Sequence, residues 1–192
     1  MIICVVGKSG SGKSYVCKLL EGFSQNILHV DVDSIAHKIL KEPEVIKKLY
    51  LTYGDTVVEH NTVNRKKLSN IVFNSDFEMD RLTEITWPPM EMCIDDIIKH
   101  NNDKIIVLDW QNLLKTKYYY MADLNILVQA PYEERIKKVV KRDNISENDF
   151  FTREKASYNF DNAKFDYIIN NDYSEKIKSI VREIYVKSII SR

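Results

Sequence analysis

The feature that most constrains this chain is a run of eight residues, 7–14, which reads GKSGSGKS. An apolar run at residues 2–6 precedes it, and apolar residues recur at helical spacing from Val16 onward. A G-x-x-x-x-G-K-[ST] pattern between a strand and a helix turns successive backbone N–H groups toward phosphate oxygens, because glycine tolerates positive φ and has no Cβ. Three of the five glycines lie in this run. We therefore expect a phosphate-binding loop rather than an ordinary glycine-rich turn.

Each residue type in this loop has an expected role. The Lys13 ammonium would neutralise β- and γ-phosphate oxygens of a nucleoside triphosphate, and the Ser14 hydroxyl would be a ligand of Mg²⁺. We expect the following residues to contact the nucleotide: Ser9, Gly10, Ser11, Gly12, Lys13, Ser14 and Tyr15.

Composition excludes several classes of protein. The chain has 192 residues, enough for one domain with a small inserted subdomain. Lysine plus arginine and aspartate plus glutamate number 28 each, so no net field attracts a nucleic acid. The cysteines Cys4, Cys17 and Cys93 lack disulfide or zinc spacing and are expected to be small core residues. The apolar start is too short to cross a membrane or to act as a signal peptide, so we expect no membrane partner and a reduced, cytoplasmic location.

Alternating strands and helices predict an α/β fold. Apolar runs at residues 2–6, 27–33, 104–109, 124–128 and 165–170 are typical of buried parallel strands. Helical spacing is expected at residues 34–40, 133–142, 146–157 and 174–190, and the charged stretch 44–100 is helical apart from breaks at Tyr53-Gly54 and at Trp87 with the two prolines after it. We predict a P-loop three-layer sandwich with a five-stranded parallel sheet. Residues 1–33 and 101–192 would form the nucleotide-binding core, residues 34–100 a helical acceptor-binding insertion, and residues 138–157 a small lid.

Carboxylates end two of the predicted strands. In an open parallel sheet the carboxyl ends of the strands face the ligand crevice, where Asp31, Asp33 and Asp109 would lie. We expect Asp33 to lie on the same side of an extended strand as Asp31, and to orient or deprotonate an attacking hydroxyl. Either Asp31 or Asp109 would serve the Mg²⁺ shell. The alternative for Asp31 and Asp33 is that they cap the following helix.

A phosphate loop alone does not separate GTPases, ATP-driven machines and small-molecule kinases. The chain has no Asn-Lys-x-Asp guanine motif and no long second domain. Arg142 ends a basic helix beside a turn at Asp143-Asn144, so it is either a surface arginine or a planar cation for the transferring phosphoryl group. The arrangement favours a kinase whose lid excludes water from the reaction.

Taken in order, these motifs resemble the dephospho-CoA kinase family nearly end to end. The matching segments are the phosphate loop at residues 7–14, the Asp-x-Asp strand end at 29–33, Tyr53-Gly54, and residues 64–73, 82–88, 141–143 and 166–171. The resemblance implies ATP- and Mg²⁺-dependent phosphorylation of the ribose 3′-hydroxyl of dephospho-coenzyme A, giving coenzyme A and ADP. It also implies that residues 34–100 hold the acceptor and that residues around 142–153 belong to the lid.

The resemblance also implies roles for single residues. Asp33 is the expected base, Lys13 and Arg142 are phosphate electrophiles, and Arg65 is an acceptor contact. Further expected contacts are Trp87, Asp109 and Arg153 for the acceptor and Asn170 for the nucleotide.

Four positions depart from the family pattern. Trp87 replaces a histidine, Lys115 an acid, Lys138 an arginine and Lys8 a glycine. These changes concern the acceptor pocket more than the phosphate loop, so two alternatives stay open: a nucleoside or nucleoside monophosphate kinase, and a non-catalytic ATP-binding module. The expected partner is a small molecule, with the protein a monomer or weak homo-oligomer.

Overall fold

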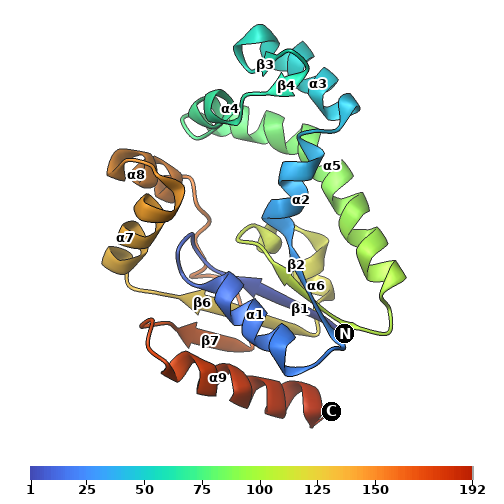
Figure 1. Cartoon of the computed structure of the whole chain (residues 1–192), viewed down its shortest axis with the longest axis vertical. Coiled ribbons are helices and arrows are strands. Elements are labelled where there is room, and N and C mark those ends of the chain that lie inside the picture. Colours follow the sequence, from blue (N-terminus) through green and yellow to red (C-terminus); the bar gives the residue numbers. More distant parts are fainter. Residues whose placement is uncertain (192) are drawn as a thin grey trace. The chain divides into compact units, whose positions relative to one another are not determined.

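The computed structural model describes residues 1–191 and divides into two compact units (Figure 1). The first unit contains residues 1–31 and the chain from Asn101 onward, and the second contains Val32–His100. Each unit is described by itself. Within residues 1–191, no helix is both long enough and apolar enough to cross a membrane.

A five-stranded parallel sheet with strand order β2-β5-β1-β6-β7 forms the centre of the first unit. Its strands are β1 (Ile2–Val6), β2 (Ile27–Asp31), β5 (Ile105–Asp109), β6 (Leu124–Gln129) and β7 (Tyr167–Asn170). These are the five predicted apolar runs, with shifts of a few residues at their ends. In the register of β2 with β5, Asp31 lies opposite Asp109. Two of the predicted carboxylates therefore lie side by side at the carboxyl ends of these strands.

Helices cover both faces of this sheet, as a three-layer sandwich requires. On one face, α1 (Lys13–Phe23) and α9 (Lys176–Tyr185) lie side by side (Figure 1) and bury one continuous apolar core with the strands. On the other face, the Cys4 thiol donates to the Tyr118 carbonyl at 3.5 Å, which places η2 (Leu113–Lys115) and α6 (Lys117–Met121) there. The predicted closing helix ends earlier than residue 190, because a π-helical turn at Val186–Ile190 replaces its last part.

Two further helices, α7 (Tyr132–Asp143) and α8 (Glu147–Lys155), follow β6 and pack on each other through a small apolar core. Asn144 ends α7 in the left-handed conformation. Ser146 begins α8 with a capping box, in which its side chain and that of Asp149 each accept a bond from the other's backbone N–H. The predicted turn and the predicted helix start are confirmed.

The second unit is mainly helical. Its elements are α2 (Val32–Ile39), α3 (Pro43–Tyr53), η1 (Gly54–Thr56), β3 (Val58–Glu59), β4 (Thr62–Val63), α4 (Arg65–Val72) and α5 (Asp76–His100). The antiparallel β3–β4 pair was not predicted, since two-residue strands leave no periodic signal.

Two sequence-based expectations about this unit are wrong. Asp33 does not extend β2, because α2 already begins at Val32, and Val32, Ile35 and Ile39 are buried at helical spacing. Pro88 and Pro89 do not interrupt the helix, since both lie inside α5. Residues 86, 90 and 94 of α5 are buried at four-residue intervals on both sides of the prolines, so packing outweighs the loss of two backbone donors.

Candidate active site

The loop between β1 and α1 depends on glycine at two points. A Cβ on Gly7 would collide with the Val128 carbonyl oxygen of β6, which is backbone and cannot move aside. Gly12 caps α1 at φ 97°, and a Cβ there would collide with the Asn171 amide. At Gly7 and Gly12 the loop backbone therefore lies closer to its neighbours than a residue with a Cβ would permit.

Side chains hold four consecutive carbonyl groups of the loop. Lys13 Nζ donates to the Lys8 carbonyl (3.4 Å) and the Arg135 guanidinium to the Ser9 carbonyl (3.2 Å). The Tyr173 hydroxyl donates to the Gly10 carbonyl (2.7 Å) and Asn171 Nδ2 to the Ser11 carbonyl (2.8 Å). With its carbonyls bound in this way, the loop can present N–H groups on its other side. Lys13 and Ser14 also open α1, where N–H groups have no acceptor within the helix and the helix dipole is positive.

A cavity of about 450 Å³ lies beside this loop. It is lined by Gly10, Gly12, Lys13, Ser14, Tyr15, Lys138, Val139, Arg142, Asn171, Tyr173, Ser174, Glu175 and Ile177. Lys138 Nζ lies 4.1 Å from the centre of the Tyr173 ring, within cation–π range. The cavity combines a glycine loop, three cationic side chains and two tyrosine rings, which are groups that bind the phosphates and the base of a nucleotide.

Arg142 connects the end of α7 to the phosphate loop. Its guanidinium lies 3.3 Å from the Ser9 hydroxyl and binds Asp143 through two nitrogens, at 2.7 and 3.1 Å. Arg153 of α8 donates to the same Asp143 carboxylate at 3.1 Å. The hydrogen bond from Arg142, with the charges of both arginines, lowers the pKa of Asp143 although partial burial opposes the shift. Asp143 thus brings together the two arginines that sequence motifs assigned to the lid.

Glu154 links α8 to both α7 and the loop. It accepts two hydrogen bonds from Arg135, at 2.6 and 2.9 Å, and one from Lys8 at 2.8 Å. Burial tends to raise the pKa of Glu154, but the hydrogen bonds from Arg135 and Lys8 outweigh it and lower the pKa. This network borders a second cavity of about 700 Å³, which Asn170 also lines.

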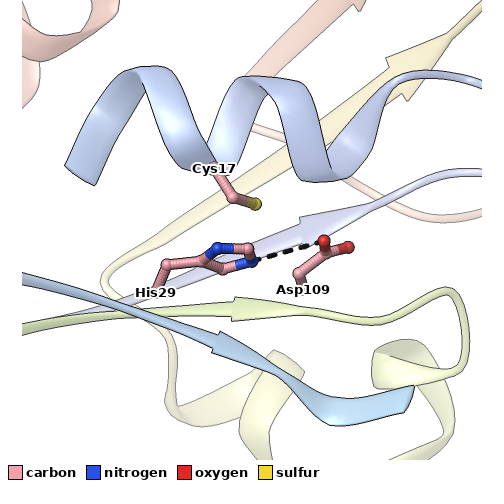
Figure 2. Close-up of side chains that lie close together, drawn as sticks. All are labelled: Cys17, His29 and Asp109. Carbon is pink, nitrogen blue, oxygen red and sulfur yellow. Dashed lines mark ion pairs between the residues drawn. The ribbon is translucent and has the colours of Figure 1, made fainter. Parts of the chain in front are cut away.

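The strand-end carboxylates differ in exposure. Asp31 is exposed, whereas Asp109 is 3% exposed and turns toward α1 (Figure 2). Asp109 Oδ2 lies 3.4 Å from His29 Nε2, near the Cys17 thiol. Burial, together with the charge of Asp109, raises the pKa of Cys17 well above the ordinary thiol value.

Three predicted site residues belong to the second unit. Asp33 is exposed in the first turn of α2. Arg65 opens α4, with a guanidinium nitrogen 2.5 Å from His37 Nε2 of α2. Trp87 is half-buried within α5.

Sequence reasoning missed four residues that hold the loop in place: Asn171, Tyr173, Arg135 and Glu154. Asn171 directly follows the predicted Asn170 at the end of β7, and Asn171 is buried whereas Asn170 is exposed. Nothing in the local sequence marks Arg135 or Glu154, since their importance arises from contacts made across the fold.

Comparison with known proteins identifies the family. The family model described as dephospho-CoA kinase matches residues 1–176. A protein named dephospho-CoA kinase from Aquifex aeolicus is 30% identical over 189 residues, covering 95% of each chain. Another of that name from Helicobacter pylori is 28% identical over 197 residues, covering 98% of this chain and 97% of the relative.

Solved structures agree on the fold. TT1252 from Thermus thermophilus superposes with a TM-score of 0.83 at 21% identity, covering 98% of this chain and 97% of the other. The dephospho-CoA kinase from Campylobacter jejuni gives a TM-score of 0.57 at 21% identity, covering 97% and 96%. With the family model spanning most of its length, the chain belongs to the dephospho-CoA kinase family.

Proposed function

We propose that this protein transfers the γ-phosphoryl group of ATP to the ribose 3′-hydroxyl of dephospho-coenzyme A. Family membership supports the substrate. The observation that carries the chemistry is the phosphate loop, whose carbonyls are held by side chains while Lys13, Ser14 and Arg142 line the adjoining cavity.

In this proposal the ATP phosphates bind the loop amides, and the nucleoside lies along the cavity toward Tyr173 and Lys138. Lys13 and Arg142 bind oxygens of the transferring phosphoryl group, where negative charge must be stabilised. The hydrogen bond of Arg142 to the Ser9 hydroxyl of the loop supports this role.

The residues present fit a magnesium ion. Ser14 and Asp31 are exposed and offer hydroxyl and carboxylate oxygens, the donors that Mg²⁺ prefers. Bound there, Mg²⁺ would neutralise charge on the phosphates. We choose Asp31 over Asp109 because the Asp109 carboxylate is buried beside His29.

We propose Asp33 as the group that orients the acceptor hydroxyl and takes its proton. The proposal rests on the position of Asp33 in the Asp-Val-Asp motif and on its exposed carboxylate. Residues 34–100 would hold the acceptor, with contacts from Arg65, Trp87 and Arg153, and residues 138–157 would close as a lid that excludes water. We do not retain Asp109 as an acceptor contact, because its carboxylate is 3% exposed and lies beside His29. Asn170 stays a predicted nucleotide contact. We further expect the protein to act in the cytoplasm on small molecules, as a monomer or weak homo-oligomer.

The decisive experiment measures ADP release from ATP and Mg²⁺ with dephospho-CoA, nucleosides and nucleoside monophosphates as separate acceptors. We expect turnover with dephospho-CoA, and a product whose mass is larger by one phosphate. Turnover only with another acceptor would replace the proposed substrate, and ATP binding without any turnover would favour a non-catalytic module.

Substitution of the proposed base sharpens this test. Asp33→Asn should reduce kcat by at least about 100-fold and leave ATP affinity unchanged, because general-base catalysis contributes about 10²–10⁴. The matched control is Asp55→Asn, an exposed acid of the same unit, which should behave as wild type. Near-normal turnover of Asp33→Asn would exclude Asp33 as the base.

A further inference from the structure

Three side chains of types that can bind a metal ion meet in the layer between α1 and the sheet (Figure 2). Cys17 comes from α1, His29 from β2 and Asp109 from the end of β5. Their ligand atoms all lie within 4.8 Å of one another. In Figure 2 the thiol points toward the space between the imidazole and the carboxylate.

One buried side-chain atom in each of the two polar members of this cluster lacks a hydrogen-bonding partner. His29 Nε2 and Asp109 Oδ2 are buried and, among residues 1–191, neither atom makes a hydrogen bond. They lie 3.4 Å apart, which is within ion-pair distance, but the contact does not qualify as a hydrogen bond. Buried polar atoms are nearly always partnered, so a missing ligand is a direct explanation for two orphaned atoms that face each other.

The chemistry of the three donors selects the ligand. Thiolate, imidazole and carboxylate together are typical ligands of Zn²⁺, whereas Mg²⁺ and Ca²⁺ prefer oxygen alone. Zinc–ligand bonds of about 2.0–2.3 Å in a tetrahedron separate neighbouring ligand atoms by roughly 3.3–3.8 Å. The His29–Asp109 separation of 3.4 Å falls within this range.

We propose that Cys17 Sγ, His29 Nε2 and Asp109 Oδ2 bind one Zn²⁺ ion, with water as a fourth ligand. On binding, the Cys17 thiol releases its proton to solvent and a Zn–S bond forms, with no change in oxidation state. Sequence spacing does not reveal the site, because its ligands come from three different elements.

This site uses none of the proposed magnesium ligands, Ser14 and Asp31. Cys17 follows Lys13 by about one helical turn of α1. Asp31 lies opposite Asp109 in the register, but unlike Asp109 it is exposed. A zinc ion would cross-link α1, β2 and β5 and stabilise the first unit. The inference is independent of the proposed catalytic function, and its test does not use kinase activity.

The test titrates the reduced, metal-free protein with Co²⁺, a spectroscopic substitute for Zn²⁺. We expect one ion per chain, a thiolate-to-cobalt charge-transfer band, and displacement of Co²⁺ by Zn²⁺ but not by millimolar Mg²⁺. Cys93→Ser should retain the band, whereas Cys17→Ser should lose it. His29→Asn and Asp109→Asn should each weaken Zn²⁺ binding at least about tenfold, because each removes one ligand.

Circular dichroism of each variant establishes that it is folded, and His29→Asn provides a test even if Cys17→Ser is not folded. A band that persists in Cys17→Ser would overturn the proposal, as would the absence of stoichiometric binding to the wild-type protein. Equal Zn²⁺ affinity of His29→Asn and wild type would also overturn it.

Discussion

The Arg135 guanidinium binds the Glu154 carboxylate through two hydrogen bonds, at 2.6 and 2.9 Å, and joins helix α7 to helix α8. The same guanidinium donates to the Ser9 carbonyl, and Lys8 donates to Glu154 from within the loop. Arg135 is only 5% exposed, and the Glu154 carboxylate compensates its buried positive charge. The pair therefore couples the position of α8 to the shape of the phosphate loop.

Glu154→Gln should lower the free energy of unfolding by about 2 kcal/mol, because a buried arginine loses its charged acceptor. Urea denaturation followed by circular dichroism measures the change. The matched control is Glu183→Gln on α9, which breaks an exposed ion pair with Lys187 and should leave stability unchanged. Equal stability of Glu154→Gln and wild type would show that Arg135 does not depend on Glu154.

Acid should weaken the same network. The pKa of Glu154 is lowered in the folded protein, so its contribution to stability is complete above the ordinary glutamate pKa and is lost as pH falls through the folded value. Asp143, whose pKa is also lowered, acts in the same direction. Unfolding free energies measured from pH 7 down to pH 3 should decline. The unfolding free energy of Glu154→Gln should decline less steeply than that of the wild type. Identical slopes for the variant and the wild type would contradict the prediction.

Gly12→Ala should abolish ATP binding and destabilise the protein. The new methyl group would collide with the Asn171 amide, and alanine disfavours the φ of 97° that Gly12 adopts. Both effects should displace the loop. Gly22→Ala is the control, because no atom lies within 4 Å of its added Cβ and it occupies an ordinary position in α1. This control should stabilise the protein by about 0.5–1 kcal/mol. Calorimetric titration with ATP measures binding, and normal affinity of Gly12→Ala would contradict the expected geometry.

Arg142→Lys should reduce kcat more strongly than it weakens ATP binding. Lysine retains the charge but loses the planar fork that binds two oxygens at once. We expect a loss of at least tenfold in kcat with a change below threefold in the KM for ATP. Lys141→Arg is the matched exposed control on the same helix end. A wild-type kcat for Arg142→Lys would mean that only the charge of Arg142 matters, because both variants keep a cation.

Much of the fold follows from the chain's local chemistry. Residues 7–14 predict the phosphate loop, apolar runs predict the five parallel strands, and Ser146 predicts the start of α8. These features depend on neighbours in sequence, because backbone sterics, capping and periodicity act over a few residues. The family likewise follows from an ordered series of motifs.

Only the tertiary structure decided three matters. It ended β2 at Asp31 and placed Asp33 in a helix, because burial of Val32 and Ile35 outweighs the extended pattern. It showed that Asn171, Arg135 and Glu154 support the loop from positions more than a hundred residues away. It also brought Cys17, His29 and Asp109 within 4.8 Å of one another. Contacts between distant segments arise from packing, which no local pattern of residues records.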